Sequence, residues 1–450
     1  MKFPRNFAWG AATASFQWEG ALTEDGRGPS IWDEFTHTPG KIYDGHTADV
    51  ACDFYHRYPE DLSLMQELGI PALRFSLSWS RILPEGTGRV NQAGLDFYSR
   101  LVDCMLEKGI APYMTLFHWD YPLALEHRGS WLNPDSPRWF ADYADVVMRR
   151  LGDRVKHVIT FNEPQCFIGS GHGSDIDAPG LKRSRKELLL MAHRVMLGHG
   201  LGVQAIRAAA PDTLVGYAPT CSGTIPATHS PEDIEAARKA YFHVSPASPT
   251  WCVSWWSDPV ILGQYPEEPA RAMEADLPVI GPDDLKTMCQ PLDFYGQNIY
   301  NGRPVASDGN GGWVDLHRPD GFAHSTLNWP ITPEVLYWAP KFLYERYKLP
   351  FYITENGMAC HDWVSLDGKV HDPNRIDMMA RYLQAFGRAI EDGVDGRGYF
   401  AWTLLDNFEW RVGYSTRFGM VYTDFQTQER IPKDSAYWFG EVARTNGAII

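Results

Sequence analysis

Two glutamates follow apolar segments in closely similar local sequences. Glu163 belongs to Thr-Phe-Asn-Glu-Pro at 160–164, and Glu355 belongs to Ile-Thr-Glu-Asn-Gly at 353–357. Cleavage of a glycosidic bond requires two facing carboxyl groups, one a protonated acid and the other an ionised nucleophile or base. Their surroundings must separate their pKa values. A single glutamate in this setting could simply cap a helix, but two in parallel contexts favour catalysis.

Other polar and aromatic residues occur where apolar segments end. Arg74 lies inside the apolar segment 72–79, and a buried guanidinium needs an anion, either a nucleophilic carboxylate or a structural partner. Aromatic faces and carboxylates together can hold the apolar face and the hydroxyls of a sugar. The further candidates of this kind are Gln17, His118, Trp119, Asn298, Tyr300, Trp402, Glu409 and Trp410.

Several other chemistries find no support in the sequence. No H-E-x-x-H or paired Cys/His spacing predicts a metal site, and no G-x-S-x-G elbow is present. The glycine-rich stretch 169–173 lacks the phosphate-binding pattern and is interpreted as a flexible loop. Acidic residues outnumber basic ones, 56 to 41, giving a net charge of −15, which argues against nucleic acid as a partner. We expect neither a metal nor another cofactor.

The elements that must position these residues alternate along the chain. Strand-like segments are predicted at 7–15, 72–79, 111–117, 155–161, 214–219, 292–298, 351–355 and 398–404. Helical patterns lie between them, including one capped by Asn91 and one opened by a capping box at 184–187. Eight such repeats predict an α/β fold, a single (β/α)8 barrel domain over 1–450, rather than a doubly wound sheet.

In such a barrel, Glu163 and Glu355 end the fourth and seventh strands, which face each other across the mouth. The long intervals 220–290 and 301–330 are then insertions in the βα loops, which belong to the active face of a barrel.

Several sequence features bear on the cellular compartment of the protein. The N-terminal sequence lacks the pattern of a signal peptide, and no apolar run approaches the roughly 20 residues that span a membrane. The seven cysteines are odd in number and show no C-x-x-C spacing, so we expect reduced thiols in the cytoplasm and no membrane partner. Oligomeric state cannot be inferred from these features.

Six ordered motifs resemble those of glycoside hydrolase family 1, the β-glucosidases and their relatives. They are the segments 7–20, 74–81, 116–120, 160–164, 353–357 and 402–410, and the resemblance extends over nearly the whole chain. It implies a retaining mechanism with Glu355 as nucleophile and Glu163 as acid/base, the carboxyl groups lying roughly 5–5.5 Å apart.

The resemblance also implies roles for the other residues. Arg74 and Tyr300 would hold Glu355 ionised, and Asn162 would contact the 2-hydroxyl, with Asn298 close by. The sugar of the substrate would be held by Gln17, His118, Trp119, Trp402, Glu409 and Trp410. Trp329, Gln165 and His172 would lie on the aglycone side. Gln165 replaces a common Trp, and Asp177 replaces the usual His of a His-Ala-Pro-Gly motif.

The leading hypothesis is therefore a β-glucosidase acting on small β-glycosides. A 6-phospho-β-glycosidase is an alternative, although Glu409 stands where that group carries Ser and nearby basic residues. A non-catalytic sugar-binding barrel is a second alternative, and transfer to acceptors other than water is a third. The sequence does not separate gluco, galacto and fuco preference.

Overall fold

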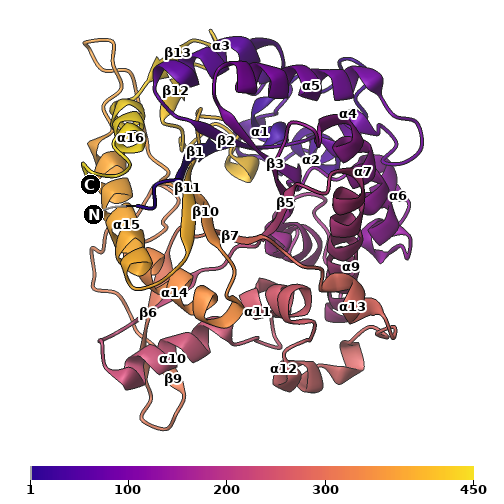
Figure 1. The fold of residues 1–450 in the computed structure, drawn as a ribbon, viewed down its shortest axis with the longest axis vertical. Coiled ribbons are helices and arrows are strands. Elements are labelled where there is room, and N and C mark those ends of the chain that lie inside the picture. Colours follow the sequence, from indigo (N-terminus) through magenta and orange to yellow (C-terminus); the bar gives the residue numbers. More distant parts are fainter. Residues whose placement is uncertain (1–2) are drawn as a thin grey trace.

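Eight parallel strands close into a barrel in the computed structural model, which describes residues 3–450. The order around the barrel is β1-β11-β10-β7-β5-β4-β3-β2, and β1 closes the ring by pairing with both β11 and β2 (Figure 1). The strands are β1 (Ala8–Ala12), β2 (Ala72–Ser76), β3 (Ala111–Phe117), β4 (His157–Asn162), β5 (Leu214–Ala218), β7 (Phe294–Asn298), β10 (Phe351–Asn356) and β11 (Gly396–Trp402). The predicted (β/α)8 barrel is confirmed.

The barrel strands have mostly apolar sequences because parallel strands are buried on both faces. All five residues of β2 and all five of β7 are buried. The predicted segments were too long at several ends. The first strand stops at Ala12, because the chain turns into a short helix at Ser15, where the Ser15 amide donates to the Ser76 hydroxyl at 2.8 Å. The second stops at Ser76, shortly before another short helix.

Helices surround the barrel and its insertions (Figure 1). They are α1 (Ser15–Trp18), α2 (Ile31–His37), α3 (Phe54–Glu67), α4 (Trp79–Ile82), α5 (Gln92–Glu107), α6 (Leu123–His127), α7 (Ser136–Leu151), α8 (Gly171–Gly173), α9 (Arg185–Ala209), α10 (Pro231–Phe242), α11 (Val253–Ser257), α12 (Glu267–Ala272), α13 (Asp284–Met288), α14 (Val335–Tyr347), α15 (Pro373–Glu391) and α16 (Asp434–Arg444). No helix within residues 3–450 is both long and apolar enough to cross a membrane.

One predicted helix cap is confirmed and another is wrong. Ser184 and Glu187 form the reciprocal capping box that begins α9. Asn91 precedes α5, but its side chain makes no cap. The Asn91 amide instead donates to the carbonyls of Asp25 and Arg81, each at 2.8 Å, and so ties the helix start to neighbouring loops.

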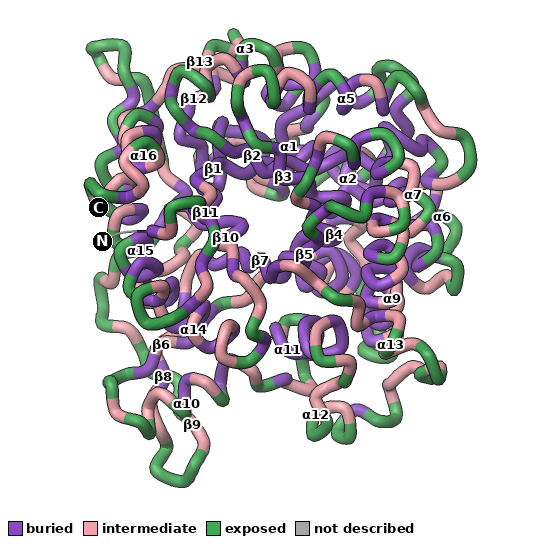
Figure 2. Tube along the Cα trace, in the orientation of Figure 1, coloured by how far each residue is buried: buried purple, intermediate pink, exposed green. Residues whose placement is uncertain are grey.

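The two long insertions predicted after the fifth and sixth strands pack together. β6 (Gly223–Pro226) from the first pairs with β8 (Gly302–Ser307) from the second, and β9 (Trp313–Asp315) completes a three-stranded sheet beside α10. Another small sheet joins β12 (Val421–Thr423) to β13 (Arg430–Pro432). Figure 2 shows the barrel strands largely buried and the tip of the β8–β9 hairpin exposed.

A buried ion cluster anchors the loop that follows β11. Lys433 is 0% exposed and donates to Asp406 at 2.8 Å and to Asp362 at 2.6 Å. Arg417 also binds Asp406, and Arg375 also binds Asp362, each at 2.7 Å. The cluster joins the loops after β10 and β11 to the start of α16, and it thereby fixes the segment 402–410.

Replacing Lys433 tests the importance of this cluster. Lys433→Met leaves two buried carboxylates without their shared cation, and breaking a buried ion pair in this way costs about 3–5 kcal/mol. We expect the free energy of unfolding, measured with denaturant, to fall by that amount. The control is Lys341→Met, which breaks a partly exposed 3.6 Å pair with Glu345 and should change stability by less than about 1 kcal/mol. Equal losses in both variants would contradict this account.

Candidate active site

The carboxyl ends of the barrel strands open into a cavity of about 510 Å³. Its wall contains most of the residues singled out from the sequence. Those that line it are His118, Trp119, Glu163, Tyr300, Trp329, Glu355, Trp402, Glu409 and Trp410. Such a concave site, aromatic and with few converging polar groups, is typical of a pocket for a small ligand.

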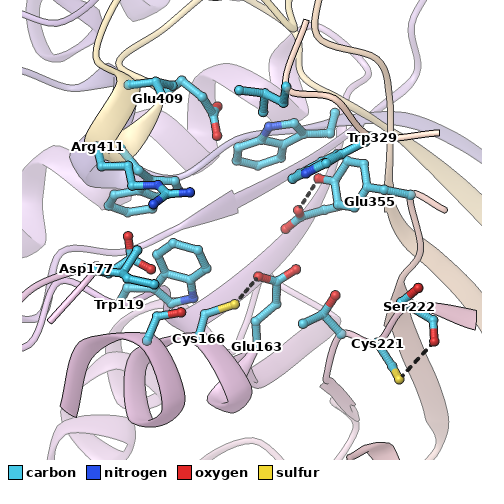
Figure 3. Close-up of a pocket in the computed structure, with 18 of the residues that line it drawn as sticks. Trp119, Glu163, Cys166, Asp177, Cys221, Ser222, Trp329, Glu355, Glu409 and Arg411 are labelled. Atoms are coloured by element: carbon cyan, nitrogen blue, oxygen red, sulfur yellow. Dashed lines mark hydrogen bonds between the residues drawn. The ribbon is translucent and has the colours of Figure 1, made fainter. Parts of the chain in front are cut away.

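Glu163 and Glu355 are brought to this cavity by two strands, β4 and β10, that are separated in the barrel by β5 and β7. Glu163 directly follows β4, and Glu355 lies near the end of β10. Figure 3 shows both carboxyl groups directed into the same space. The backbone of Glu163 has φ of +46°, a left-handed conformation that costs energy for a residue other than glycine and that occurs often at functional sites.

Arg74 contacts Glu355 from beneath the cavity. Its side chain is 1% exposed, and Nη1 lies 2.6 Å from Oε1 of Glu355. The Tyr300 hydroxyl donates to the other oxygen, Oε2, at 2.7 Å. Both oxygens of Glu355 are therefore held by donors, which stabilises the ionised carboxylate and fixes its orientation.

Two asparagines connect this ion pair to Glu163. Arg74 Nη2 donates to Oδ1 of Asn162 at 2.5 Å, and Asn298 Nδ2 donates to Oε1 of Glu163 at 2.7 Å. The hydroxyl of Thr354 donates to Oδ1 of Asn298 at 2.7 Å. Asn298 Nδ2 also donates to Oδ1 of Asn162 at 3.0 Å. Because that oxygen already accepts from Arg74, which has no acceptor, the Asn298 atom beside it must be the N–H end of the amide, and Asn298 is oriented to donate to Glu163.

The two carboxyl groups therefore have different environments. Burial, and then the charge of Glu355, raise the pKa of Glu163 to about 7. Burial also raises the pKa of Glu355, but the cation of Arg74 and the hydrogen bond from Tyr300 act to lower it. In the singly ionised pair, the proton therefore belongs on Glu163 and the charge on Glu355.

The end of the cavity around Glu409 contains polar atoms without a protein partner. Gln17 Nε2 donates to the Phe408 carbonyl at 2.9 Å and to Glu409 at 3.3 Å, whereas its Oε1 is buried and unpaired. Burial raises the pKa of Glu409 to about 8, and the charge of Glu355 adds to that shift. Such unpaired buried atoms are available to bind hydroxyl groups.

His118 is a second group of this kind. Its Nε2 lies 3.0 Å from Nδ2 of Asn162, and Oδ1 of that amide already accepts from Arg74. Nδ2 must therefore donate to His118, which places the imidazole proton on Nδ1, the atom that is buried and unpaired. Burial lowers the pKa of His118 well below its usual value, so the ring is neutral.

Aromatic rings complete this end of the cavity. The indole rings of Trp119 and Trp410 stack with centroids 4.5 Å apart, and His118 stacks on Trp402 at 5.8 Å. Trp119 also donates to the Asn162 carbonyl at 3.2 Å, which joins the ends of β3 and β4. These flat, partly polar surfaces match a ring with an apolar face and polar edges.

Two residues expected on the aglycone side do not line this cavity. Gln165 is 0% exposed, and its Oε1 accepts from the Thr220 amide at 3.3 Å. His172 is also buried, with Nδ1 2.8 Å from the Phe167 carbonyl and Nε2 3.5 Å from Glu126. The reason is local. Gln165 begins a π-helical turn over Gln165–Ser170, and His172 lies in the short helix α8 that follows it; both side chains are buried in the protein interior. Trp329 does line the cavity.

Cys166, Thr354 and Arg411 belong to the site but were not expected from the sequence. The Cys166 thiol donates to Oε2 of Glu163 at 3.2 Å, and both Cys166 and Arg411 line the cavity (Figure 3). The spacing of three residues between Glu163 and Cys166 could have indicated this contact, since a turn joins them in which the Cys166 amide donates to the Glu163 carbonyl at 2.9 Å. Within residues 3–450, no group of three or more His, Cys, Asp or Glu side chains could hold a metal ion.

A barrel with paired carboxyl groups at its mouth is the architecture of many glycosidases. The family model described as glycosyl hydrolase family 1 matches residues 1–448. The chain is 44% identical to the 1,4-beta-D-glucan glucohydrolase of Thermotoga neapolitana, with 99% of each chain covered. It is also 44% identical to Beta-glucosidase A of Thermotoga maritima, with 99% of this chain and 98% of the relative covered.

Solved structures agree with these similarities. The beta-glucosidase from Thermotoga maritima in complex with glucoimidazole superposes with a TM-score of 0.91, at 44% identity and 99% coverage of both chains. The chain belongs to glycosyl hydrolase family 1, and it is a hydrolase of glycosidic bonds.

The contact between Arg74 and Glu355 yields a prediction about ionisation. Arg74→Met removes a cation 2.6 Å from the carboxylate, and a cation at such a distance typically lowers a carboxyl pKa by about 1–3 units. We expect the pKa of Glu355 to rise by about that amount, measured by carbon NMR titration with ¹³C-labelled glutamate. Arg411→Met is the control, because Arg411 lines the same cavity without a hydrogen bond to Glu355. An unchanged Glu355 pKa in Arg74→Met would show that Arg74 does not control the ionisation.

Proposed function

We propose that this protein is a retaining β-glucosidase that releases the terminal β-glucosyl residue from small β-glucosides. Glu355 is the nucleophile and Glu163 the general acid/base. The observation that carries the proposal is the unequal pair of carboxyl groups. Glu355 is held by Arg74 and Tyr300, whereas Glu163 has no cation among its hydrogen-bond partners Asn298 and Cys166.

The reaction proceeds in two displacements. Glu355 attacks the anomeric carbon while Glu163 transfers its proton to the departing oxygen, so that the glycosidic bond breaks and a glycosyl-enzyme forms. Glu163, now ionised, accepts a proton from water as that water attacks the anomeric carbon. The bond to Glu355 breaks, the sugar leaves with its original anomeric configuration, and both carboxyl groups return to their starting states.

The second half of the cycle depends on the position of Glu163. Asn298 donates to Oε1 at 2.7 Å, whereas Oε2 receives only the weak Cys166 thiol donor at 3.2 Å, so Oε2 is the oxygen that carries the proton that moves. After the first displacement, the negative charge of Glu355 is lost in the ester, so the pKa of Glu163 falls. Such cycling of the pKa suits a group that must first be an acid and then a base.

The proposed substrate is an unphosphorylated glucoside. Glu409, Gln17 and His118 present a carboxyl group, an amide oxygen and an imidazole N–H to the sugar hydroxyls. A 6-phosphate would bring further negative charge to the buried Glu409 carboxyl, which is already hard to ionise. The printed names of the relatives, beta-glucosidase and 1,4-beta-D-glucan glucohydrolase, agree with this choice.

We further propose that residues 1–450 act as one catalytic domain in the cytoplasm. Support for the compartment comes from the cysteines: all seven are free, from Cys52 to Cys360, as expected for a protein that works in a reducing environment. Neither metal nor cofactor is required by the two displacements.

Substitution of the two glutamates tests the assigned roles. Glu355→Ala should reduce kcat on every β-glucoside to near zero, because no covalent intermediate can form. Glu163→Gln should reduce kcat/KM on alkyl glucosides by about 10²–10⁴-fold, the usual contribution of general acid catalysis. Its first step on an aryl glucoside with an activated leaving group should change far less. The basic limb of the pH profile should also disappear.

A surface variant serves as the control for the two glutamate substitutions. Glu334→Gln, at a surface ion pair with Arg388, should behave as wild type. Equal losses on alkyl and activated substrates in Glu163→Gln would contradict its role as the acid. Activity of the wild type only on an aryl β-glucoside 6-phosphate would favour the phosphoglycosidase alternative, and inactivity on both substrates would favour a sugar-binding protein.

A further inference from the structure

One thiol in the cavity wall touches the proposed acid. Cys166 lines the cavity, and its Sγ donates to Oε2 of Glu163 at 3.2 Å. Figure 3 shows the thiol directed at the Glu163 carboxyl group. The two displacements described above make no use of Cys166, although it contacts the oxygen whose proton moves.

A short turn holds the thiol at this oxygen. The Cys166 amide donates to the Glu163 carbonyl at 2.9 Å. Pro164 lies between the two residues in a helical conformation, with φ of −60°, and begins the π-helical turn that contains Cys166. Because one turn fixes the backbone of both residues, the Cys166 side chain reaches back to the Glu163 carboxyl group through a local contact.

The thiol remains protonated at the pH at which Glu163 titrates. Burial raises the pKa of Cys166 well above its usual value, and the carboxyl groups of Glu163 and Asp177 add to that rise. The pKa of Glu163 is raised only to about 7. Cys166 therefore keeps its S–H in both ionisation states of Glu163 and acts as a neutral donor.

The two donors to Glu163 respond differently to its proton. Asn298 donates to Oε1 at 2.7 Å, and that oxygen stays a good acceptor when the proton is on Oε2. Cys166 donates to Oε2 itself, and a hydrogen bond to an ionised oxygen is roughly twice as strong as one to a neutral oxygen. The thiol bond therefore strengthens as the proton leaves Oε2 and weakens as a proton returns.

We propose that Cys166 is a positioning residue that stabilises the negative charge developing on Glu163 while this glutamate protonates the leaving group. The inference rests on the proposed function, because it concerns the proton that Glu163 donates. An interaction that is stronger in the transition state than in the ground state increases the rate, so the thiol assists the first displacement. In the second displacement, the same bond weakens as Glu163 takes a proton from water, and the thiol gives that step no assistance.

Other charged and titratable groups also act on Glu163 and Cys166, and they come from several elements. They are Arg74 on β2, Tyr300 after β7, Glu355 on β10, Glu409 after β11 and Asp177 before α9. The hydrogen bond of the thiol goes to Glu163 and to none of these side chains. A changed titration of Glu163 in a Cys166 variant therefore reports the loss of the thiol.

Substitution of Cys166 tests the proposal on two leaving groups. Cys166→Ala removes the donor and should lower kcat/KM on an alkyl β-glucoside by about two- to tenfold, the range expected for one hydrogen bond. On 2,4-dinitrophenyl β-glucoside, whose leaving group departs without a proton, kcat/KM should stay close to the wild-type value. Cys166→Ser keeps a donor at this position and should restore the rate on the alkyl glucoside.

The pH profile gives a second readout. Loss of a donor to the carboxylate raises the pKa of Glu163, so the basic limb of kcat/KM should move to higher pH by about 0.4–1 unit in Cys166→Ala. Cys221→Ala is the matched control, because Cys221 lines the same cavity while its thiol donates to the Ser222 carbonyl at 3.3 Å. It should leave the basic limb unmoved. Cys166→Val also removes the donor and replaces Cys166→Ala if that variant does not fold.

The second displacement separates this role from support of the fold. A 2-deoxy-2-fluoroglucosyl group on Glu355 is lost slowly to water, and its rate of loss should not fall in Cys166→Ala. A residue that only supported the fold would slow both displacements.

Several results would overturn the proposal. They are equal losses of kcat/KM on the alkyl and dinitrophenyl glucosides, an unmoved basic limb in the variants that lack the donor, no rescue by Cys166→Ser, and a slower loss of the fluoroglucosyl group. Failure of the proposed function would instead appear in the wild type, as inactivity on both glucosides.

Discussion

The arrangement of the site depends on one buried guanidinium. Arg74 rises from β2 at 1% exposure and binds Glu355 on β10 and Asn162 on β4. A buried cation is stable only with anions and acceptors around it, so the barrel must bring these three strands to fixed positions. The same contact that satisfies Arg74 therefore orients Glu355 and, through Asn162, sets the hydrogen bond to His118.

This constraint also explains how two carboxyl groups in one cavity come to differ. Glu355 lies against the cation, and Glu163 is reached only through the neutral donors Asn298 and Cys166. Burial raises the pKa of both, and the Arg74 cation opposes this rise mainly at Glu355, which it contacts directly.

Much of this could be predicted from the sequence, since parallel strands and their helices have strong periodic patterns. Glu163, Glu355 and Arg74 were recognisable because burying a charged side chain at or within an apolar strand is unfavourable unless a partner compensates the charge. Gln165 and His172, expected on the aglycone side, do not line the cavity. Gln165 begins the π-helical turn over Gln165–Ser170, and no periodic pattern in the sequence predicts such a turn. The hydrogen bond from Thr354 to Asn298 joins two distant segments of the chain, a contact that local sequence does not encode.

The central claim is that Glu355 forms a covalent bond to the sugar. The enzyme is incubated with a 2-deoxy-2-fluoro β-glucoside that carries an activated leaving group. The fluorine slows both displacements, and the activated leaving group speeds the first one again, so that the glycosyl-enzyme accumulates. Digestion and mass spectrometry should then locate one fluoroglucosyl group on the peptide that contains Glu355, with none on the peptide of Glu163. A label on the Glu163 peptide, or a turnover that yields the inverted anomer with no labelled peptide, would contradict the account.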